Sequence, residues 1–322
     1  MNILFCSVGR RAELLKDFRK SMSPGSKIIA TDMSPYAPAI YFADKHYFLP
    51  PISDPSYINR IAEICQIENI HAITTLIDPE IEILAKNRGL FEHMGTVVLA
   101  PYHKTASICF DKYELFQHLK KHGIATADTY SSFIEAKAAI ENSVLSLPVF
   151  VKPRTGSGSV GARKIESLKD LEAACDADPS LIIQEFMDCV DMDADVYIDT
   201  ITHKPVSIFT KKKLETKIGG ASKTISFKDD AADKFICEAL QYFQFNGPID
   251  MDLFYRDGQY YISEINPRFG GAYLHAYGAG VDFVKLIENN VNGIENSPCF
   301  GNYEENVVMM MYDSVVIEKV MP

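Results

Sequence analysis

The sequence predicts an α/β domain built on a parallel sheet, followed by an α+β domain built on antiparallel strand pairs. Its length of 322 residues suits about two domains. Strands and helices alternate over the first hundred residues, which is typical of a parallel sheet. After residue 147, predicted strands follow one another with few helices between them, and this favours antiparallel pairing.

Composition and charge exclude two classes of partner. Apolar residues make up 47% of the chain and charged residues 23%, as in ordinary globular proteins. The net charge of −11 argues against nucleic-acid binding, which needs a basic surface. No apolar run reaches the roughly 18 residues of a membrane span. We therefore expect no nucleic-acid and no membrane partner.

The first residues and the cysteines indicate a cytoplasmic protein. Residues 1–6 lack the basic region and the small-residue cleavage site of a signal peptide, so we expect them to form the first strand. The seven cysteines are scattered and form no C-x-x-C pair. Reduced thiols are therefore expected, and not a disulfide or a metal centre.

The first domain is predicted to span residues 1–100. Apolar runs predict its strands, and helical spacing or start signals predict its helices. Asp78 and Pro79 are predicted to begin a helix, with Asp78 as the cap and Pro79 in the first turn. Strands are predicted at 2–6, 27–31, 71–76 and 95–99, and a helix at 57–67.

The second domain is predicted to span 101–300, with a lid subdomain at about 123–187 and a C-terminal extension over 301–322. Asp111 opens a D-x-x-E capping box, which predicts a helix start. Further helices are predicted at 131–142, 167–174 and 229–243. Strands are predicted at 147–152, 180–186, 195–201, 206–210, 223–227, 249–255, 260–265 and 306–312.

A loop of glycine and serine follows a predicted strand that ends in Lys152. Glycines let backbone N–H groups approach an anion, serines add hydroxyl donors, and a lysine supplies a point charge for phosphate oxygens. The alternative interpretation is a flexible hairpin tip. The small residues of the loop that are candidates for phosphate binding are Gly156, Ser157, Gly158 and Ser159.

A predicted hairpin over 250–268 brings acidic residues together. A two-residue turn would set Asp252 opposite Ser263, whereas a three-residue loop would place Asp252 and Glu264 on one face. Gly258 suits the left-handed position that ends a three-residue loop, so we predict that register.

The shared face of this hairpin gives an oxygen-only cluster. Glu264 and Asn266 lie two apart on one strand and point the same way, and Asp252 joins them in the predicted register. Such a cluster suits Mg²⁺ that bridges to phosphates. A solvated hairpin face is the alternative, and it is weakened because Arg268 ends the strand beside the acids.

Two further segments have weaker signals. A buried strand at 181–187 ends in a stretch that offers backbone groups to a purine edge and apolar faces to its ring; a plain core strand is the alternative. The lysines at 211–213, with Lys217 and Lys223, are predicted to form a solvated charged stretch. The candidate purine-binding residues are Gln184, Glu185, Phe186 and Met187.

In chain order these segments resemble the ATP-grasp superfamily, and most nearly its stand-alone members of the carbamoyl-phosphate-synthase large-subunit type. The most specific segment is Glu264-Ile265-Asn266-Pro267-Arg268-Phe269-Gly270-Gly271, which is similar to the family's metal-and-substrate motif. The resemblance implies a Rossmann-like pre-ATP-grasp domain followed by an ATP-grasp fold. The other matching segments are Thr75–Glu80, Asp111-Lys112, Lys152-Pro153 with its loop, Gln184–Met187 and Lys211–Gly219.

The resemblance also implies roles for single residues. Lys112 and Lys152 would contact the α- and β-phosphates of ATP, and the loop after Lys152 would cover the β- and γ-phosphates. Asp195 stands where a ribose-binding glutamate is expected, although the stretch before it lacks the family's glycine-rich turn. Arg268, together with Lys152, would stabilise the transferring phosphoryl group. One or two Mg²⁺ ions, or Mn²⁺, would be held by Asp252, Glu264 and Asn266.

The activity that the resemblance implies is ADP-forming ligation. ATP would convert a small-molecule carboxylate to an acyl phosphate, which an amine or a thiol then attacks. Two alternatives stay open: phosphorylation of bicarbonate or carbamate, as in carbamoyl phosphate synthesis, and a non-catalytic ATP-binding sensor. A homodimer is the common closed form for such a chain. We expect His275, near the motif, to be a hydrogen-bonded structural residue.

Overall fold

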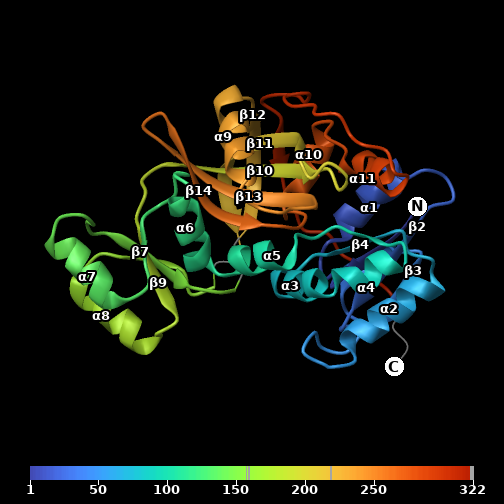
Figure 1. Ribbon diagram of the computed structural model, residues 1–322, viewed down its shortest axis with the longest axis horizontal. Coiled ribbons are helices and arrows are strands. Elements are labelled where there is room, and N and C mark those ends of the chain that lie inside the picture. The colour runs from blue at the N-terminus through green and yellow to red at the C-terminus, as the bar shows by residue number, and fades with distance from the viewer. Residues whose placement is uncertain (157, 159, 218–219, 320–322) are drawn as a thin grey trace.

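The computed structural model describes residues 1–156, 158, 160–217 and 220–319, and it arranges them around three sheets (Figure 1). A parallel sheet lies at one end of the molecule, a large antiparallel sheet in the middle and a smaller antiparallel sheet at the other end. The predicted fold class, a parallel α/β part followed by an antiparallel α+β part, is confirmed. The domain boundaries near residues 100 and 300 stay predictions.

The first sheet forms because short apolar strands alternate with helices, which parallel strands need for their crossovers. Its strands are β1 (Asn2–Cys6), β2 (Lys27–Asp32), β3 (Lys45–Phe48), β4 (Ala72–Thr75) and β5 (Val97–Val98). Their order is β3-β2-β1-β4-β5, and every neighbouring pair is parallel. From β1 the chain adds β2 and β3 on one side and then β4 and β5 on the other, so the strand order switches between β1 and β4. Open α/β sheets bind ligands at such a switch point. The helices of this part are α1 (Ala12–Ser21), η1 (Pro38–Phe42), α2 (Tyr57–Ile67), α3 (Asp78–Lys86) and α4 (Arg88–His93).

The middle sheet has one apolar face. Its strands are β10 (Val190–Ile198), β11 (Pro205–Lys217), β12 (Gly220–Phe227), β13 (Gly247–Arg256), β14 (Gln259–Asn266) and β15 (Val308–Met310). Their order is β14-β13-β10-β11-β12-β15, all antiparallel. Residues of α6 (Lys112–Lys121) and α9 (Asp230–Leu240) share the hydrophobic core of the apolar face. Helix α5 (His103–Phe110) precedes α6 and contacts β14.

The smaller antiparallel sheet forms a lid-like part with its own core. Its strands are β6 (Thr129–Tyr130), β7 (Val149–Pro153), β8 (Arg163–Ile165) and β9 (Leu181–Glu185), in the order β6-β9-β7-β8. Helices α7 (Phe133–Glu141) and α8 (Leu168–Ala177) pack against it (Figure 1). A separate hydrophobic cluster, which includes Val151, Leu171 and Ile183, fills the space between them.

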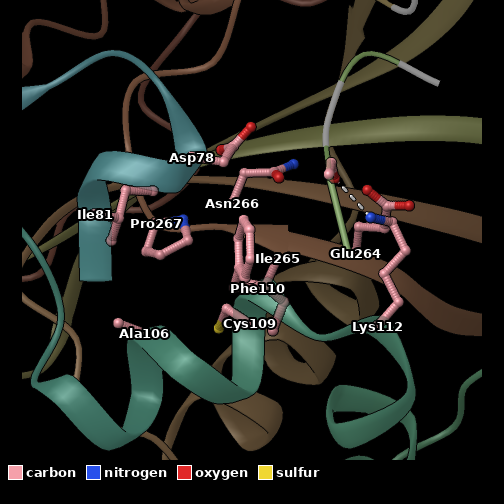
Figure 2. Close-up of a pocket in the computed structure, with 11 residues that line it drawn as sticks. Asp78, Ile81, Ala106, Cys109, Phe110, Lys112, Glu264, Ile265, Asn266 and Pro267 are labelled. Carbon is pink, nitrogen blue, oxygen red and sulfur yellow. Dashed lines mark hydrogen bonds between the residues drawn. The ribbon is translucent and has the colours of Figure 1, made fainter. Parts of the chain in front are cut away.

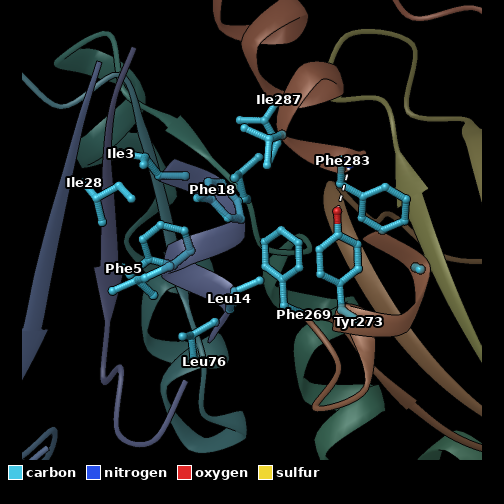
Figure 3. Packing of buried hydrophobic residues seen from close by; sticks show 14 of the residues in the cluster. Ile3, Phe5, Leu14, Phe18, Ile28, Leu76, Phe269, Tyr273, Phe283 and Ile287 are labelled. Atoms are coloured by element: carbon cyan, nitrogen blue, oxygen red, sulfur yellow. Dashed lines mark hydrogen bonds between the residues drawn. The ribbon is translucent and has the colours of Figure 1, made fainter. Parts of the chain in front are cut away.

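An aromatic core joins the first sheet to the end of the chain. Phe5 and Phe18 come from β1 and α1, and they meet Phe269, Tyr273 and Phe283 from the segment after β14 (Figure 3). The Phe18 and Phe269 rings lie 5.5 Å apart, edge to face. The segment includes the helices α10 (Tyr273–Gly278) and α11 (Phe283–Val291). The position of the loop after β14 is therefore set by packing against the first sheet.

None of the helices within the described residues has the length and apolar character needed to cross a membrane. The thiols of all seven cysteines are free.

Candidate active site

One face of the middle sheet carries charged side chains, whereas the other is apolar. Because side chains alternate along a strand, Asp191, Asp193 and Asp195 of β10 share the charged face, and the residues between them belong to the apolar core. Lys211 of β11 and Asp252 of β13 lie directly across from Asp193 on the two neighbouring strands. The charged face is therefore continuous over several strands.

The hairpin of β13 and β14 reaches the predicted arrangement by another route. Its turn has two residues, Asp257 and Gly258, with φ of 53° and 83°, so the predicted three-residue loop is wrong. This turn alone would set Asp252 opposite Ser263. A bulge at Ser263 shifts the register, and Asp252 then lies opposite Glu264. The predicted shared face is confirmed, although its cause is the bulge and not the turn.

A lysine from the lid-like part reaches this cluster. Lys152 of β7 is 8% exposed at its side chain, and its Nζ donates to Glu264 Oε1 at 3.0 Å. Asn266 Nδ2 donates to Asp252 Oδ2 at 3.3 Å. Two different sheets thus bring the three candidate metal ligands and a candidate phosphate-binding lysine together.

Three cations on the charged face each bridge two carboxylates. They are Lys211 with Asp193 and Asp195, Lys213 with Asp191 and Asp252, and Arg268 with Asp78 and Asp250. Burial works to raise the pKa of Asp252, but the Lys213 ammonium holds that pKa below its usual value. Removing one partner of such a buried pair leaves an uncompensated charge, so each pair fixes the position of its members.

The lysines at 211–213 do not form the predicted solvated stretch. The side chains of Lys211 and Lys213 are only 0% and 12% exposed, and Lys212 points elsewhere, 5.2 Å from the Phe227 ring centroid. Their acidic partners lie on neighbouring strands, which one segment cannot reveal. A signal was present nonetheless, because the acids at 191, 193, 195, 250 and 252 and the lysines at 211 and 213 recur with the period of a strand.

A small pocket lies beside the cluster and is bordered by Lys112, the first residue of α6 (Figure 2). The Nζ atom of Lys112 donates to Gly156 O at 2.8 Å, and this bond links α6 to the predicted phosphate loop. Burial lowers the pKa of Lys112, and the nearby Glu264 carboxylate works in the opposite direction. The loop residues Ser157 and Ser159, also predicted to bind phosphate, lie outside the described residues.

The predicted purine-binding segment lies at the end of β9. The buried Gln184 donates from Nε2 to Thr129 Oγ1 at 3.0 Å. Glu185 accepts a hydrogen bond from Arg256 Nη1 at 2.8 Å. These two side chains are engaged within the protein, and the backbone N–H of Glu185 donates to Asp128 O at 2.8 Å. The contact of this segment with a purine stays a prediction.

Asp195 does not fit the predicted ribose contact. Its side chain is 1% exposed, and its carboxylate accepts from the Lys211 ammonium. Burial raises the pKa of Asp195 to about 6, and Lys211 partly offsets this effect. Asp191, on the same strand and nearer in the chain to the candidate purine-binding segment, is 43% exposed at its side chain. The acid of β10 that a ligand can reach is therefore Asp191.

Arg268 follows β14 and contacts the first domain. Its Nε and Nη2 donate to Asp78 Oδ1 at 2.6 Å and to Oδ2 at 3.2 Å, and Nη1 donates to Asp250 Oδ2 at 3.3 Å. Burial works against the charge of Arg268, but Asp78 and Asp250 hold its pKa above the ordinary value. Asp78 is not the predicted cap of α3, because Ile77 occupies the N-cap position and no side chain caps the helix.

The oxygen donors on the charged face fit Mg²⁺. This ion prefers oxygen ligands and binds through one or two carboxylates together with substrate phosphates, with no need for an all-protein cage. Asp252, Glu264 and Asn266 offer such oxygens on one face. In the part of the chain that the structure describes, no group of three or more Asp, Glu, His or Cys side chains is placed to hold a metal ion.

Two family descriptions cover most of the chain. Residues 3–99 match the N-terminal domain described as PylC-like, and residues 109–272 match the ATP-grasp domain. The second match spans just over half of the sequence, so the chain belongs to the ATP-grasp family. The matches do not confirm the carbamoyl-phosphate-synthase subtype.

Solved structures show the same fold. N5-carboxyaminoimidazole synthetase from Staphylococcus aureus aligns with a TM-score of 0.75 and 18% identity, over 96% of this chain and 81% of that one. An L-amino acid ligase from Bacillus licheniformis aligns with a TM-score of 0.68 and 16% identity, over 92% of this chain and 75% of that one. At these identities the likeness establishes the fold alone.

Curated relatives match over shorter stretches. The D-alanine–D-alanine ligase of Flavobacterium johnsoniae is 31% identical over 107 residues, which is 31% of this chain and 33% of that protein. The matches span about a quarter to about a third of the length of the curated relatives.

Proposed function

We propose that the protein is an ADP-forming, Mg²⁺-dependent ligase that joins a carboxylate to an amine through an acyl phosphate. Lys112 and Lys152 would bind the phosphates of ATP, because Lys152 donates to Glu264 and Lys112 lines the same pocket as Glu264 from another element. Phosphoryl transfer depends on positioning and charge neutralisation more than on covalent help. The charged face offers positioning and charge neutralisation, because ion pairs hold its lysines, arginine and carboxylates in place.

Each step would use groups that this chain supplies. Asp252, Glu264 and Asn266 would hold Mg²⁺, which supplies positive charge to the phosphate oxygens when bound. Arg268 would stabilise the negative charge on the transferring phosphoryl group. The loop that Lys112 contacts at Gly156 would exclude water and so protect the acyl phosphate from hydrolysis. The amine would then displace phosphate.

One observation carries the proposal. The bulge at Ser263 places Asp252 opposite Glu264, and Lys152 of another sheet meets Glu264 at 3.0 Å. Asp252 and Glu264 belong to the middle sheet, and the buried Lys152 belongs to the lid-like part. This arrangement suits a metal-bound phosphate that lies between the middle sheet and the lid-like part. The curated relative named D-alanine–D-alanine ligase supports the choice of an amine as the acceptor.

The test is a product analysis with Mg²⁺, ATP and pools of small carboxylates and amines. Release of ADP and phosphate that requires both a carboxylate and an amine supports the proposal. Release of AMP points to adenylation and contradicts it. ADP release with bicarbonate and no other carboxylate favours the carbamoyl-phosphate-like alternative, and tight ATP binding without turnover in any pool favours the sensor.

A further inference from the structure

We infer that Asp78 of the first domain is a positioning residue for Arg268, and that it sets the orientation of the guanidinium toward the transferring phosphoryl group. The inference rests on the proposed function, because it concerns the same phosphoryl transfer. It assigns part of the active-site geometry to the carboxyl end of β4 in the parallel sheet, on a domain separate from the candidate metal ligands.

The contact between the two residues is side-on and bidentate. Nε of Arg268 lies 2.6 Å from Oδ1 of Asp78, and Nη2 lies 3.2 Å from Oδ2. The two side chains are only 13% and 12% exposed. Two parallel charge-assisted bonds fix the plane of a guanidinium as well as its position. Solvent screening is weak at this exposure, so the pair holds its geometry.

The remaining donors of Arg268 show what this orientation achieves. A guanidinium has five N–H donors. Nε and one hydrogen of Nη2 serve Asp78, and Nη1 donates to Asp250 Oδ2 and to Phe269 O at 3.3 and 3.1 Å. Among the described residues, this leaves one Nη2 hydrogen for an external oxygen. Asp78 therefore decides where that hydrogen points.

Asp78 is itself held by the fold. It follows β4 closely and is the first residue of α3, with Pro79 next to it in the first turn. Arg11, at the start of α1, holds the loop that carries Arg268, because it donates to the backbone oxygens of Gly270 and Phe269 at 2.7 and 3.0 Å. The carboxyl ends of β1 and β4 thus supply two side chains that hold the loop after β14.

The direct test replaces Asp78 with Asn, which has nearly the same size. The amide can accept only one of the two hydrogen bonds, and its NH₂ group would face a guanidinium N–H. The probe is Mg·ADP with aluminium fluoride, a mimic of the phosphoryl group in flight, so that the unidentified substrate is not needed. We expect Asp78→Asn to weaken this complex about 100-fold, while the affinity for Mg·ADP alone stays unchanged.

A second variant separates positioning from a general structural role. If Asp78 acts through Arg268, the change Asp78→Asn adds no further loss in an Arg268→Gln background. The matched control is Glu82→Gln on the same helix, whose carboxylate accepts from Ser107 at 2.7 Å, away from the cluster. It should leave the complex unchanged. Thermal unfolding of every variant checks that it is folded.

Three results would overturn the inference: an unchanged aluminium fluoride complex in Asp78→Asn, an equal loss of Mg·ADP affinity, or additive losses in the double variant. Failure of the wild-type protein to form the complex while it binds Mg·ADP is a different outcome. It would contradict the proposed phosphoryl transfer itself, and the role of Asp78 with it.

Discussion

Among single residues, Glu264 is the one on which most of the candidate site depends. It faces Asp252 across the hairpin and accepts the hydrogen bond of the buried Lys152. We expect Glu264→Ala to lower Mg·ATP turnover about 100-fold or more, because a metal ligand is lost and Lys152 is left without its partner. Phosphate release measures the effect, and circular dichroism should show a fold close to the wild type.

The matched control for this change is Glu238→Ala on α9, where the carboxylate is half exposed and lies 3.8 Å from Lys234. Exposed pairs of this kind contribute little to stability, so activity should be retained. Substantial turnover in Glu264→Ala would show that the metal is bound elsewhere.

His275 is buried and hydrogen-bonded, as the sequence predicts. Its Nδ1 lies 2.7 Å from Thr224 Oγ1, and its Nε2 lies 3.0 Å from Val307 O. Burial, assisted by the nearby Lys211 ammonium, lowers the pKa of His275 to about 4. The imidazole is therefore neutral in the folded protein at pH values where it is already protonated in the unfolded chain.

This pKa shift gives stability a defined pH dependence. The contribution of His275 is present in full above pH 6.5 and is lost as the pH falls towards 4, because the unfolded chain takes up the proton first. The loss reaches about 3 kcal/mol in the free energy of unfolding. Urea unfolding at several pH values measures it, and His275→Gln should show a flatter dependence between pH 6.5 and 4. Parallel curves for the two proteins would contradict the assignment.

Among the elements, the start of α6 couples a helix cap to the phosphate loop. Asp111 accepts hydrogen bonds from the backbone N–H groups of Tyr113 and Glu114 at 3.0 and 3.1 Å, which confirms the predicted cap. It also accepts from Arg154 Nε at 2.7 Å, and the backbone of Lys112 donates to Arg154 O at 3.0 Å. The cap therefore holds Lys112 and the first residues of the loop together.

We expect Asp111→Ala to lower the free energy of unfolding by about 1 kcal/mol and to weaken ATP binding as well, because Lys112 loses its fixed position. Denaturant unfolding and calorimetric titration with Mg·ATP measure the two effects. Asp111→Asn is the control, since asparagine caps a helix as well as aspartate does. An equal loss of stability in both variants would assign the effect to the Arg154 ion pair.

The elements of this chain were predictable to the extent that their patterns are local. The helix at 57–67 and the strands around residues 2–6 and 249–255 follow apolar spacing and were predicted with small errors in their bounds. The pairing of Asp252 with Glu264 was predicted correctly, but from a three-residue turn that the hairpin does not have. The bulge at Ser263 causes this pairing, and it depends on the surrounding sheet and has no signal in the adjacent sequence.

The site was predictable where one segment holds the signal. Glu264 and Asn266 share a strand, so their common face follows from the sequence alone. The partners of Lys211 and Arg268 come from distant strands and from the first domain, and local patterns misassigned them. Asp78 suited a helix cap by sequence, and only the packed fold shows that Arg268 holds it instead.

In the whole molecule, the loop after β14 and the first sheet share one hydrophobic core, whereas the lid-like part has a core of its own. Phe269 comes three residues after Asn266, and its ring lies 5.5 Å from that of Phe18 and 4.9 Å from that of Tyr273. The cluster that includes Leu171 belongs to the lid-like part alone. Unfolding of the first sheet should therefore disturb the loop after β14 before it affects the lid-like part.

Phe269→Ala tests this division. Truncation of a fully buried phenylalanine costs about 3–5 kcal/mol in the free energy of unfolding, and Phe269 is 1% exposed. We expect hydrogen exchange to accelerate in β1, α1 and α10 together, while amides of β7 and β9 keep their protection. The matched control is Leu171→Ala, which should have the opposite pattern. If Phe269→Ala lowered the protection of both parts equally, the molecule would unfold as one cooperative unit, and the lid-like part would not be an independent one.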